Sequence, residues 1–76
     1  MTIKIKIDTI EKVKEFVKIS MTVPEDLNVK AGRFIVDAKS LMGLFSVDLT
    51  KPLLLEIPGC SERSYEIAGL FKDFLV

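Results

Sequence analysis

Few side chains in this sequence are of a type that carries out chemistry. The 76 residues include no histidine and one cysteine, Cys60. Without an imidazole, neither a Ser–His–Asp triad nor a Cys–His pair can form, and histidine cannot ligate a metal ion. Cys60 precedes a predicted helix, a position that favours a thiolate, but neighbouring Glu62 opposes the electropositive setting that a reactive thiol needs. We therefore expect no catalytic residue, no metal site, no cofactor and no enzymatic activity.

Asp8 and Glu11 are two carboxylates three residues apart, a pair that could serve acid–base chemistry or cap a helix. In a capping box, the first side chain accepts from the free N–H groups of a helix, and the side chain three residues later reaches back. An apolar pattern at helical spacing begins at Ile10, directly after this position. The spacing therefore favours the cap, with Asp8 as the capping residue.

The elements that position these residues follow from the periodicity of apolar side chains. Residues 3–7 alternate Ile and Lys, which predicts a half-buried strand. Residues 9–21 predict an amphipathic helix that ends before Pro24. Residues 27–30 and 34–38 alternate on either side of a short link containing Gly32, which predicts an antiparallel hairpin. The apolar stripe of the helix consists of Ile10, Val13, Phe16, Val17 and Met21.

Ser40 is a suitable N-cap for a short helix over residues 41–45. This helix should be weak, because Gly43 costs about 1 kcal/mol relative to alanine in a helix interior. Its four large apolar residues cannot all be buried, because successive residues of a helix point about 100° apart. We expect Leu44 to face the core, and Met42 with at least part of Leu41 or Phe45 to face solvent.

The remaining chain predicts one more strand and one more helix. Residues 53–57 form the strand, with Pro52 at its start. Ser61 caps the helix, whose apolar stripe is Ile67, Leu70, Phe71, Phe74 and Leu75. The resulting order is β-α-β-β-α-β-α. Strands with one wet face are typical of an antiparallel sheet covered by helices on its other face, a two-layer α+β fold.

Length and composition predict a single domain over residues 1–76. Apolar residues make up 49% of the chain, enough for a core without disulfides or zinc. We expect four aromatic residues in that core, namely Phe16, Phe34, Phe71 and Phe74.

The charge balance argues against several classes of partner. Eleven basic and eleven acidic residues cancel, which disfavours nucleic-acid binding through clustered positive charge. No run of about 18 apolar residues is long enough for a membrane span, and the alternating N-terminus is unlike a signal peptide. A soluble cytoplasmic protein is therefore expected.

The residues around Ser40 read Val36-Asp37-Ala38-Lys39-Ser40-Leu41-Met42-Gly43-Leu44-Phe45-Ser46. This segment resembles the regulatory-serine region of HPr, the histidine-containing phosphocarrier of the bacterial phosphoenolpyruvate-dependent sugar phosphotransferase system. The hallmark of that region is Lys-Ser-Ile-Met-Gly, an apolar pair and another serine. The spacing fits without a gap from about Phe16 through Ile57. The resemblance implies an open-faced β-sandwich, with a four-stranded antiparallel sheet and three helices on one face.

The resemblance fails where HPr carries its phosphate. There, a Gly-Ile-His-Ala-Arg-Pro motif begins the first helix, and its histidine receives the phosphoryl group. Here the corresponding stretch is Ile7-Asp8-Thr9-Ile10-Glu11-Lys12-Val13, which has no histidine, arginine or proline. Asp8 and Glu11 add negative charge where HPr binds an anion. The phosphocarrier role therefore does not transfer to this chain.

The resemblance nevertheless implies a regulatory or adaptor protein. Ser40 would be a phosphorylation site, and the segment around it would bind a protein partner such as an HPr kinase or a transcriptional regulator. The implied partner-binding residues are Lys39, Leu41, Met42, Phe45 and Ser46. The bland interpretation is that Ser40 is a plain helix cap and that some of the apolar residues face the core. A small-ligand-binding or enzyme-accessory domain on the same scaffold is the alternative function, and a monomer or weak dimer is expected.

Overall fold

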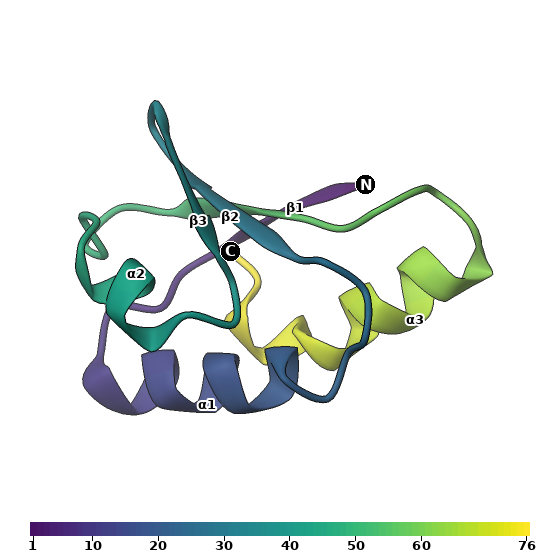
Figure 1. The fold of residues 1–76 in the computed structure, drawn as a ribbon, viewed down its shortest axis with the longest axis horizontal. Coiled ribbons are helices and arrows are strands. Elements are labelled where there is room, and N and C mark those ends of the chain that lie inside the picture. The colour runs from purple at the N-terminus through teal and green to yellow at the C-terminus, as the bar shows by residue number, and fades with distance from the viewer.

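The computed structural model describes all of residues 1–76 (Figure 1). Its elements follow the predicted order β-α-β-β-α-β-α, with one short 3-10 helix, η1, added at the end. The elements are β1 (Thr2–Ile5), α1 (Ile10–Ser20), β2 (Asn28–Ala31), β3 (Phe34–Asp37), α2 (Leu41–Phe45), β4 (Leu53–Glu56), α3 (Glu62–Leu70) and η1 (Lys72–Phe74).

The four strands form one sheet in the order β1-β4-β2-β3, and every neighbouring pair is antiparallel. Gly32 is the first of the two residues that link β2 to β3, and its φ of 60° is the positive value that a type II′ turn requires there. Alternation along the strands places Ile5, Val29 and Leu55 in the core and leaves Lys4 and Lys30 exposed on the opposite face. The predicted sheet with one wet face is therefore confirmed.

The helices cover one face of this sheet, with α1 and α3 beneath the strands and α2 at one end (Figure 1). One cluster of fifteen buried apolar residues fills the space between the two layers. At its centre, the Phe16 ring lies 5.1 Å from that of Phe71 and 5.6 Å from that of Phe74, the latter pair in edge-to-face geometry. The predicted two-layer α+β architecture is confirmed.

The start of α1 differs from the expected capping box. Thr9, and not Asp8, is the N-cap, and its Oγ1 accepts from the Lys12 N–H at 3.1 Å. Asp8 lies one residue too early to reach that N–H, and its carboxylate instead pairs with the Lys12 ammonium at 3.2 Å. The helix is also shorter than the predicted 9–21. The side chains of Ile10 and Met21, both expected on the buried stripe, are exposed because they lie at its two ends.

Phe34 was expected in the core and is 63% exposed. It faces the helical side of the sheet, but the β2–β3 hairpin projects beyond the helices, so no helix covers it (Figure 1). The expected stripe of the last helix is also wrong at Leu70 and Leu75, which are both partly exposed. The α-helix ends at Leu70 and a 3-10 helix follows, so helical spacing does not continue through Leu75. Phe71 and Phe74 face the core, whereas Leu70 and Leu75 do not.

The C-terminal residues run beside β1. Leu75 forms an isolated antiparallel bridge with Ile5, and the Lys6 N–H donates to the Phe74 carbonyl at 2.9 Å. The outer edge of β1 is thereby covered. No helix of the structure combines the length and the apolar character that crossing a membrane demands.

Candidate functional site

Ser40 begins α2 as the sequence predicts. Its backbone is extended, and its Oγ accepts from the Gly43 N–H at 3.0 Å while its carbonyl accepts from the Leu44 N–H at 3.0 Å. Its own N–H donates to the Asp37 carbonyl at 3.0 Å, so the chain turns tightly from β3 into the helix. This is a complete N-cap, in which the side-chain oxygen satisfies one of the free N–H groups of the first turn.

Gly43 fits closely against this cap. A Cβ at residue 43 would lie 3.1 Å from the Ser40 Oγ and 3.5 Å from the Val36 Cβ. A Cβ at this position would therefore crowd the cap hydroxyl, while its distance to the Val36 Cβ is an ordinary van der Waals contact. The glycine that weakens the helix by propensity thus lets α2 approach β3 closely.

The apolar residues of α2 divide between core and solvent as expected. Leu44 is fully buried, whereas Met42 is 83%, Phe45 45% and Leu41 37% exposed. In a helix of five residues, one buried position is enough to attach it to the core. The other three large side chains remain available to another molecule, and exposed apolar groups gathered in this way are typical of protein-binding sites.

Ile10 is a neighbouring apolar residue that sequence reasoning assigned to the core. It is the first residue of α1 and is 59% exposed. Helix α1 packs against α2, and the N-terminal end of α1 lies beneath it (Figure 1). We call Ile10, Leu41, Met42 and Phe45 the α2 patch. The spacing of apolar residues alone places Ile10 on the buried stripe of α1. Its exposure follows from its position at the end of the helix, which only the tertiary structure shows.

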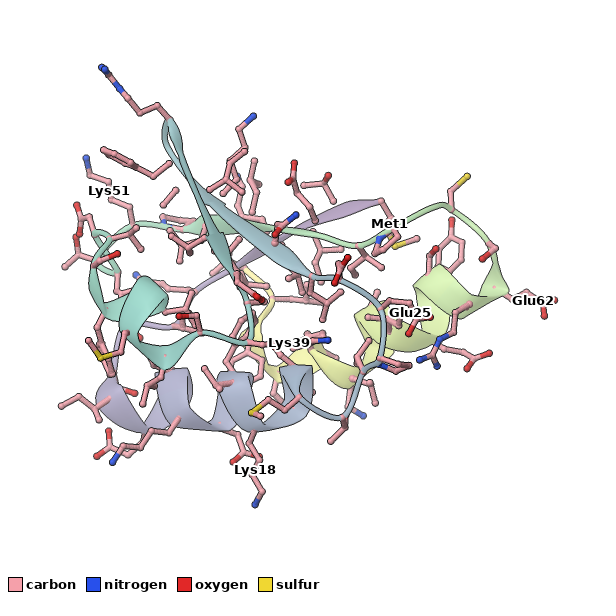
Figure 2. The ribbon with its side chains drawn as sticks, viewed as in Figure 1. Met1, Lys18, Glu25, Lys39, Lys51 and Glu62 are labelled. Carbon is pink, nitrogen blue, oxygen red and sulfur yellow. The ribbon has the colours of Figure 1, made fainter.

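Lys39 and Ser46, the two polar residues expected beside the patch, occupy different places. The Ser46 Oγ donates to the Gly43 carbonyl at 2.6 Å and closes the C-terminal end of α2 at the rim of the patch. The Lys39 N–H donates to the Asp37 carboxylate at 2.9 Å. The Lys39 ammonium is near Glu25, whose pKa it helps to lower, and Figure 2 shows its side chain extending away from α2.

An ion pair holds the loop between α1 and β2, which contains Glu25 and which the Lys39 side chain approaches. The Glu25 carboxylate accepts from the Arg63 Nε at 2.6 Å and from its Nη2 at 2.8 Å, which joins this loop to α3. The hydrogen bond from Arg63 is the main reason that the pKa of Glu25 falls to about 2. A bidentate pair of this kind holds both partners in one orientation.

The N-terminal end of α1, where HPr carries its histidine, holds no group that could accept a phosphoryl group as an imidazole does. Asp8 precedes the cap, and its hydrogen bond with the Lys12 ammonium holds its pKa below the usual value. Glu11 lies in the first turn. The Asp8 and Glu11 carboxylates give this end of the helix negative charge, partly offset by Lys12, that opposes an incoming phosphate.

The structure also contains a shallow hollow of about 390 Å³ between the tip of the β2–β3 hairpin and the chain that links α2 to β4. Its polar lining includes Arg33, Ser46, Asp48 and Lys51, the last of which is labelled in Figure 2. Every buried side-chain nitrogen and oxygen atom in the protein already has a hydrogen-bond partner, so no unsatisfied buried polar atom points into this hollow. Cys60 is exposed, and no group of three or more His, Cys, Asp or Glu side chains could hold a metal ion.

Comparison with solved structures gives a match over nearly the whole chain. A crystal structure of HPr-C-His from Thermoanaerobacter tengcongensis superposes with a TM-score of 0.72, at 21% sequence identity, over 96% of this chain and 92% of that chain. The chain has the HPr fold. No protein-family model and no curated protein matches the sequence. The open-faced sandwich that the segment around Ser40 implied is therefore confirmed.

The HPr fold gives the α2 patch its context. The strand order, the short second helix and the covering of one sheet face by helices all follow the expected scaffold. The patch lies at the end of that scaffold where α1 begins and α2 packs against it. The fold is that of HPr, and this chain has no histidine at any position.

Proposed function

We propose that this protein is a docking protein that does not transfer phosphate. It binds a protein partner through the α2 patch, and phosphorylation of Ser40 switches that binding. The observation that carries the proposal is the exposure of Leu41, Met42 and Phe45 on a helix whose only buried residue is Leu44. Expected partners are an HPr kinase or a transcriptional regulator, as the resemblance around Ser40 implies.

The chemistry of the patch supports a protein partner over a small ligand. Its side chains are large and apolar, and the thioether of Met42 adapts to differently shaped partners. It lies on a convex helix and forms no cavity, whereas small-molecule sites are concave. The shallow hollow near the hairpin has no unpartnered buried polar atom, which weighs against the ligand-binding alternative.

The position of Ser40 supports the switch. Its Oγ accepts a hydrogen bond but donates none, so the hydroxyl hydrogen is not committed to another group. A phosphate on Oγ adds about −1.5 to −2 charges directly beside the apolar patch. Such a charge lies next to Leu41 in the sequence, where it disfavours an apolar partner surface and favours one that carries arginines.

Docking can be tested with an HPr kinase as the defined partner. Its affinity for the wild-type protein is measured by calorimetry and compared with two variants, Met42→Asp and Met21→Asp. Both methionines are exposed, but Met21 ends α1 away from the patch. We expect Met42→Asp to weaken binding about tenfold or more, since interface anchors contribute 1.4 kcal/mol or more, and Met21→Asp to leave it unchanged. Equal affinity for all three proteins would contradict docking through the patch.

The switch is tested separately by incubation with the kinase and ATP. We expect one phosphate per chain on Ser40, none on Ser40→Ala, and unchanged labelling of Ser46→Ala. Loss of labelling in Ser46→Ala with retention in Ser40→Ala would assign the modification to the wrong serine and overturn the switch.

Phosphotransfer is tested with phosphoenolpyruvate and the general enzyme of the phosphotransferase system. A histidine-containing HPr serves as the positive control. We expect no phosphoprotein from this chain, because it has no imidazole. Formation of an acid-labile phosphoprotein would refute the proposal.

A further inference from the structure

The two edges of the sheet differ in how they are covered. Beside β1, the Val76 N–H donates to the Lys4 carbonyl at 3.3 Å and the Lys6 N–H donates to the Phe74 carbonyl at 2.9 Å, so the C-terminal residues cover that edge. At the other edge, β3 pairs with β2 and with no further segment. An open edge presents unpaired backbone groups that can pair with another strand.

The open edge lacks most of the features by which proteins prevent such pairing. The β3 sequence Phe-Ile-Val-Asp contains no proline and no lysine, and its pairing with β2 has no bulge. Its short length is its main protection. Phe34 and Ile35 are both more than half exposed, on opposite faces of the strand.

The backbone N–H and C=O groups of Ile35 face the open edge of β3. The Ala38 N–H donates to the Leu27 carbonyl at 3.0 Å, which makes that pair a hydrogen-bonded one. Bonded and non-bonded pairs alternate in an antiparallel ladder, so Val36 with Val29 and Phe34 with Ala31 are also bonded pairs. The N–H and C=O of Ile35, which lies between them, therefore point away from β2.

We propose that the β3 edge binds the β3 edge of a second copy of this chain, forming a two-fold symmetric dimer with an antiparallel pair of strands centred on Ile35. In this register, Ile35 of each copy exchanges two backbone hydrogen bonds with Ile35 of the partner subunit. Phe34 lies opposite Val36 of the partner subunit on the helical side, an aromatic and β-branched pair of the kind that stabilises sheets. The two four-stranded sheets become one sheet of eight strands.

Charge complementarity selects this arrangement. Centring the pair on Ile35 places Arg33 opposite Asp37 of the partner subunit, and symmetry repeats the contact. Neither Arg33 nor Asp37 takes part in an ion pair within its own chain. A parallel arrangement would instead bring Arg33 close to Arg33 of the partner subunit and Asp37 close to Asp37. The partner that fits this edge is therefore another copy of the same strand in antiparallel orientation.

This dimer is independent of the proposed docking function, because it uses none of the side chains of the α2 patch. The interface is small, since only residues 33–37 of each copy, the four of β3 and the turn residue before them, face one another. Interfaces below about 1,200 Å² are generally weak. We expect a dissociation constant on the order of 10⁻⁴ M that rises with salt, because the exposed Arg33–Asp37 pairs are screened.

The decisive experiment is a charge exchange measured by sedimentation velocity over a range of concentrations. In Arg33→Glu, two acidic groups oppose each other across the dimer, and in Asp37→Lys two basic groups do. Each variant alone is expected to dissociate about tenfold more readily than wild type. A mixture of the two restores both ion pairs, so it is expected to form heterodimers with an affinity close to wild type. Failure of the mixture to associate better than either variant alone would overturn the proposed register.

Asp37→Lys also removes the hydrogen bond that the Asp37 carboxylate accepts from the Lys39 N–H, and this loss alone could unfold the variant. A second test therefore uses a variant that leaves this hydrogen bond intact. Ile35→Lys replaces an exposed side chain and places two ammonium groups at the symmetry axis. We expect it to be folded by circular dichroism and monomeric, with Met42→Asp as the matched control that still dimerises. Dimerisation of Ile35→Lys, its loss in Met42→Asp, or a wild-type protein that is monomeric at about 1 mM would each refute the β3 dimer.

Discussion

The Ser40 hydroxyl has a structural task whether or not a kinase acts on it. It satisfies the Gly43 N–H at the start of a helix of five residues, which has few other internal hydrogen bonds. In so short a helix the cap is a large share of the local stabilisation. A modification at this atom therefore changes both the charge beside the α2 patch and the contact that holds the helix start.

Replacing Ser40 with alanine should lower the free energy of unfolding by about 1 kcal/mol, the usual effect of losing a serine cap. Ser46→Ala is the matched control, because its Oγ donates to a carbonyl at the exposed end of the same helix. We expect it to change the free energy of unfolding by less than about 0.5 kcal/mol. Urea denaturation measures both, and equal effects would show that Oγ of Ser40 does not cap the helix.

The ion pair between Glu25 and Arg63 should make the stability of the fold sensitive to acid. The pKa of Glu25 is lowered to about 2 in the folded protein, from an ordinary value of 4.5. Because the folded pKa is the lower one, the stabilisation is fully present above about pH 4.5 and is lost as the pH falls toward about 2.

We therefore expect Glu25→Gln to have a lower melting temperature than wild type at pH 7 and nearly the same melting temperature at pH 2. Circular dichroism melts at intervals of pH measure this convergence. Glu15→Gln removes a carboxylate that forms no ion pair, so its melting temperature should change with pH in the same way as that of wild type. A constant difference between Glu25→Gln and wild type from pH 7 to 2 would contradict the linkage.

At the scale of the element, α2 depends on a glycine that its helical propensity disfavours. The Ser40 Oγ lies 3.1 Å from where a Cβ of residue 43 would be, closer than ordinary van der Waals contact. An alanine there gains about 1 kcal/mol of helical propensity but crowds the cap. The two effects oppose each other, so the outcome depends on whether the hydroxyl is present.

A double-mutant cycle separates them. Gly43→Ala should be neutral or destabilising in the wild-type background, because the cap hydroxyl must move. In the Ser40→Ala background the crowding oxygen is absent, and the same substitution should stabilise the protein by about 0.5–1 kcal/mol. Denaturation of the four proteins gives the coupling, and strict additivity would show that the close approach of residue 43 to the cap has no energetic effect.

At the scale of the whole molecule, three separate segments contribute the three aromatic rings of the single core cluster of fifteen buried residues. Phe16 comes from α1, Phe71 from the end of α3 and Phe74 from η1. All three rings are buried and lie within 6.4 Å of one another. A chain of 76 residues has a total stability of only about 4–11 kcal/mol, so the loss of one buried ring can remove much of it.

Phe71→Ala should cost about 3–5 kcal/mol and leave the protein marginally folded or unfolded. Phe34→Ala provides the control within the same residue type. Phe34 is mostly exposed, so we expect its loss to lower the free energy of unfolding of the monomer by less than about 1 kcal/mol. Thermal denaturation at low protein concentration measures both. A large effect at Phe34 would show that the hairpin tip packs against the core.

Local pattern determined much of this protein in advance. The alternation of Ile and Lys in residues 3–7 and the helical spacing of Val13, Phe16 and Val17 indicated elements close to those observed, because side-chain direction is fixed by backbone geometry. Ser40 as a cap and the division of α2 into buried Leu44 and exposed Met42 also followed from local geometry. The segment around Ser40 predicted the HPr fold through its resemblance.

The tertiary structure decided which apolar side chains of each helix and strand are covered by another element. Periodicity assigns a face to Phe34 and Ile10 but does not say whether anything lies against that face, and both proved exposed at the ends of their elements. The partner of Glu25 is 38 residues away at Arg63, and the C-terminus meets β1 across almost the whole chain. Such contacts depend on how the layers are packed, because burial and long-range pairing are properties of the assembled fold and not of the spacing along it.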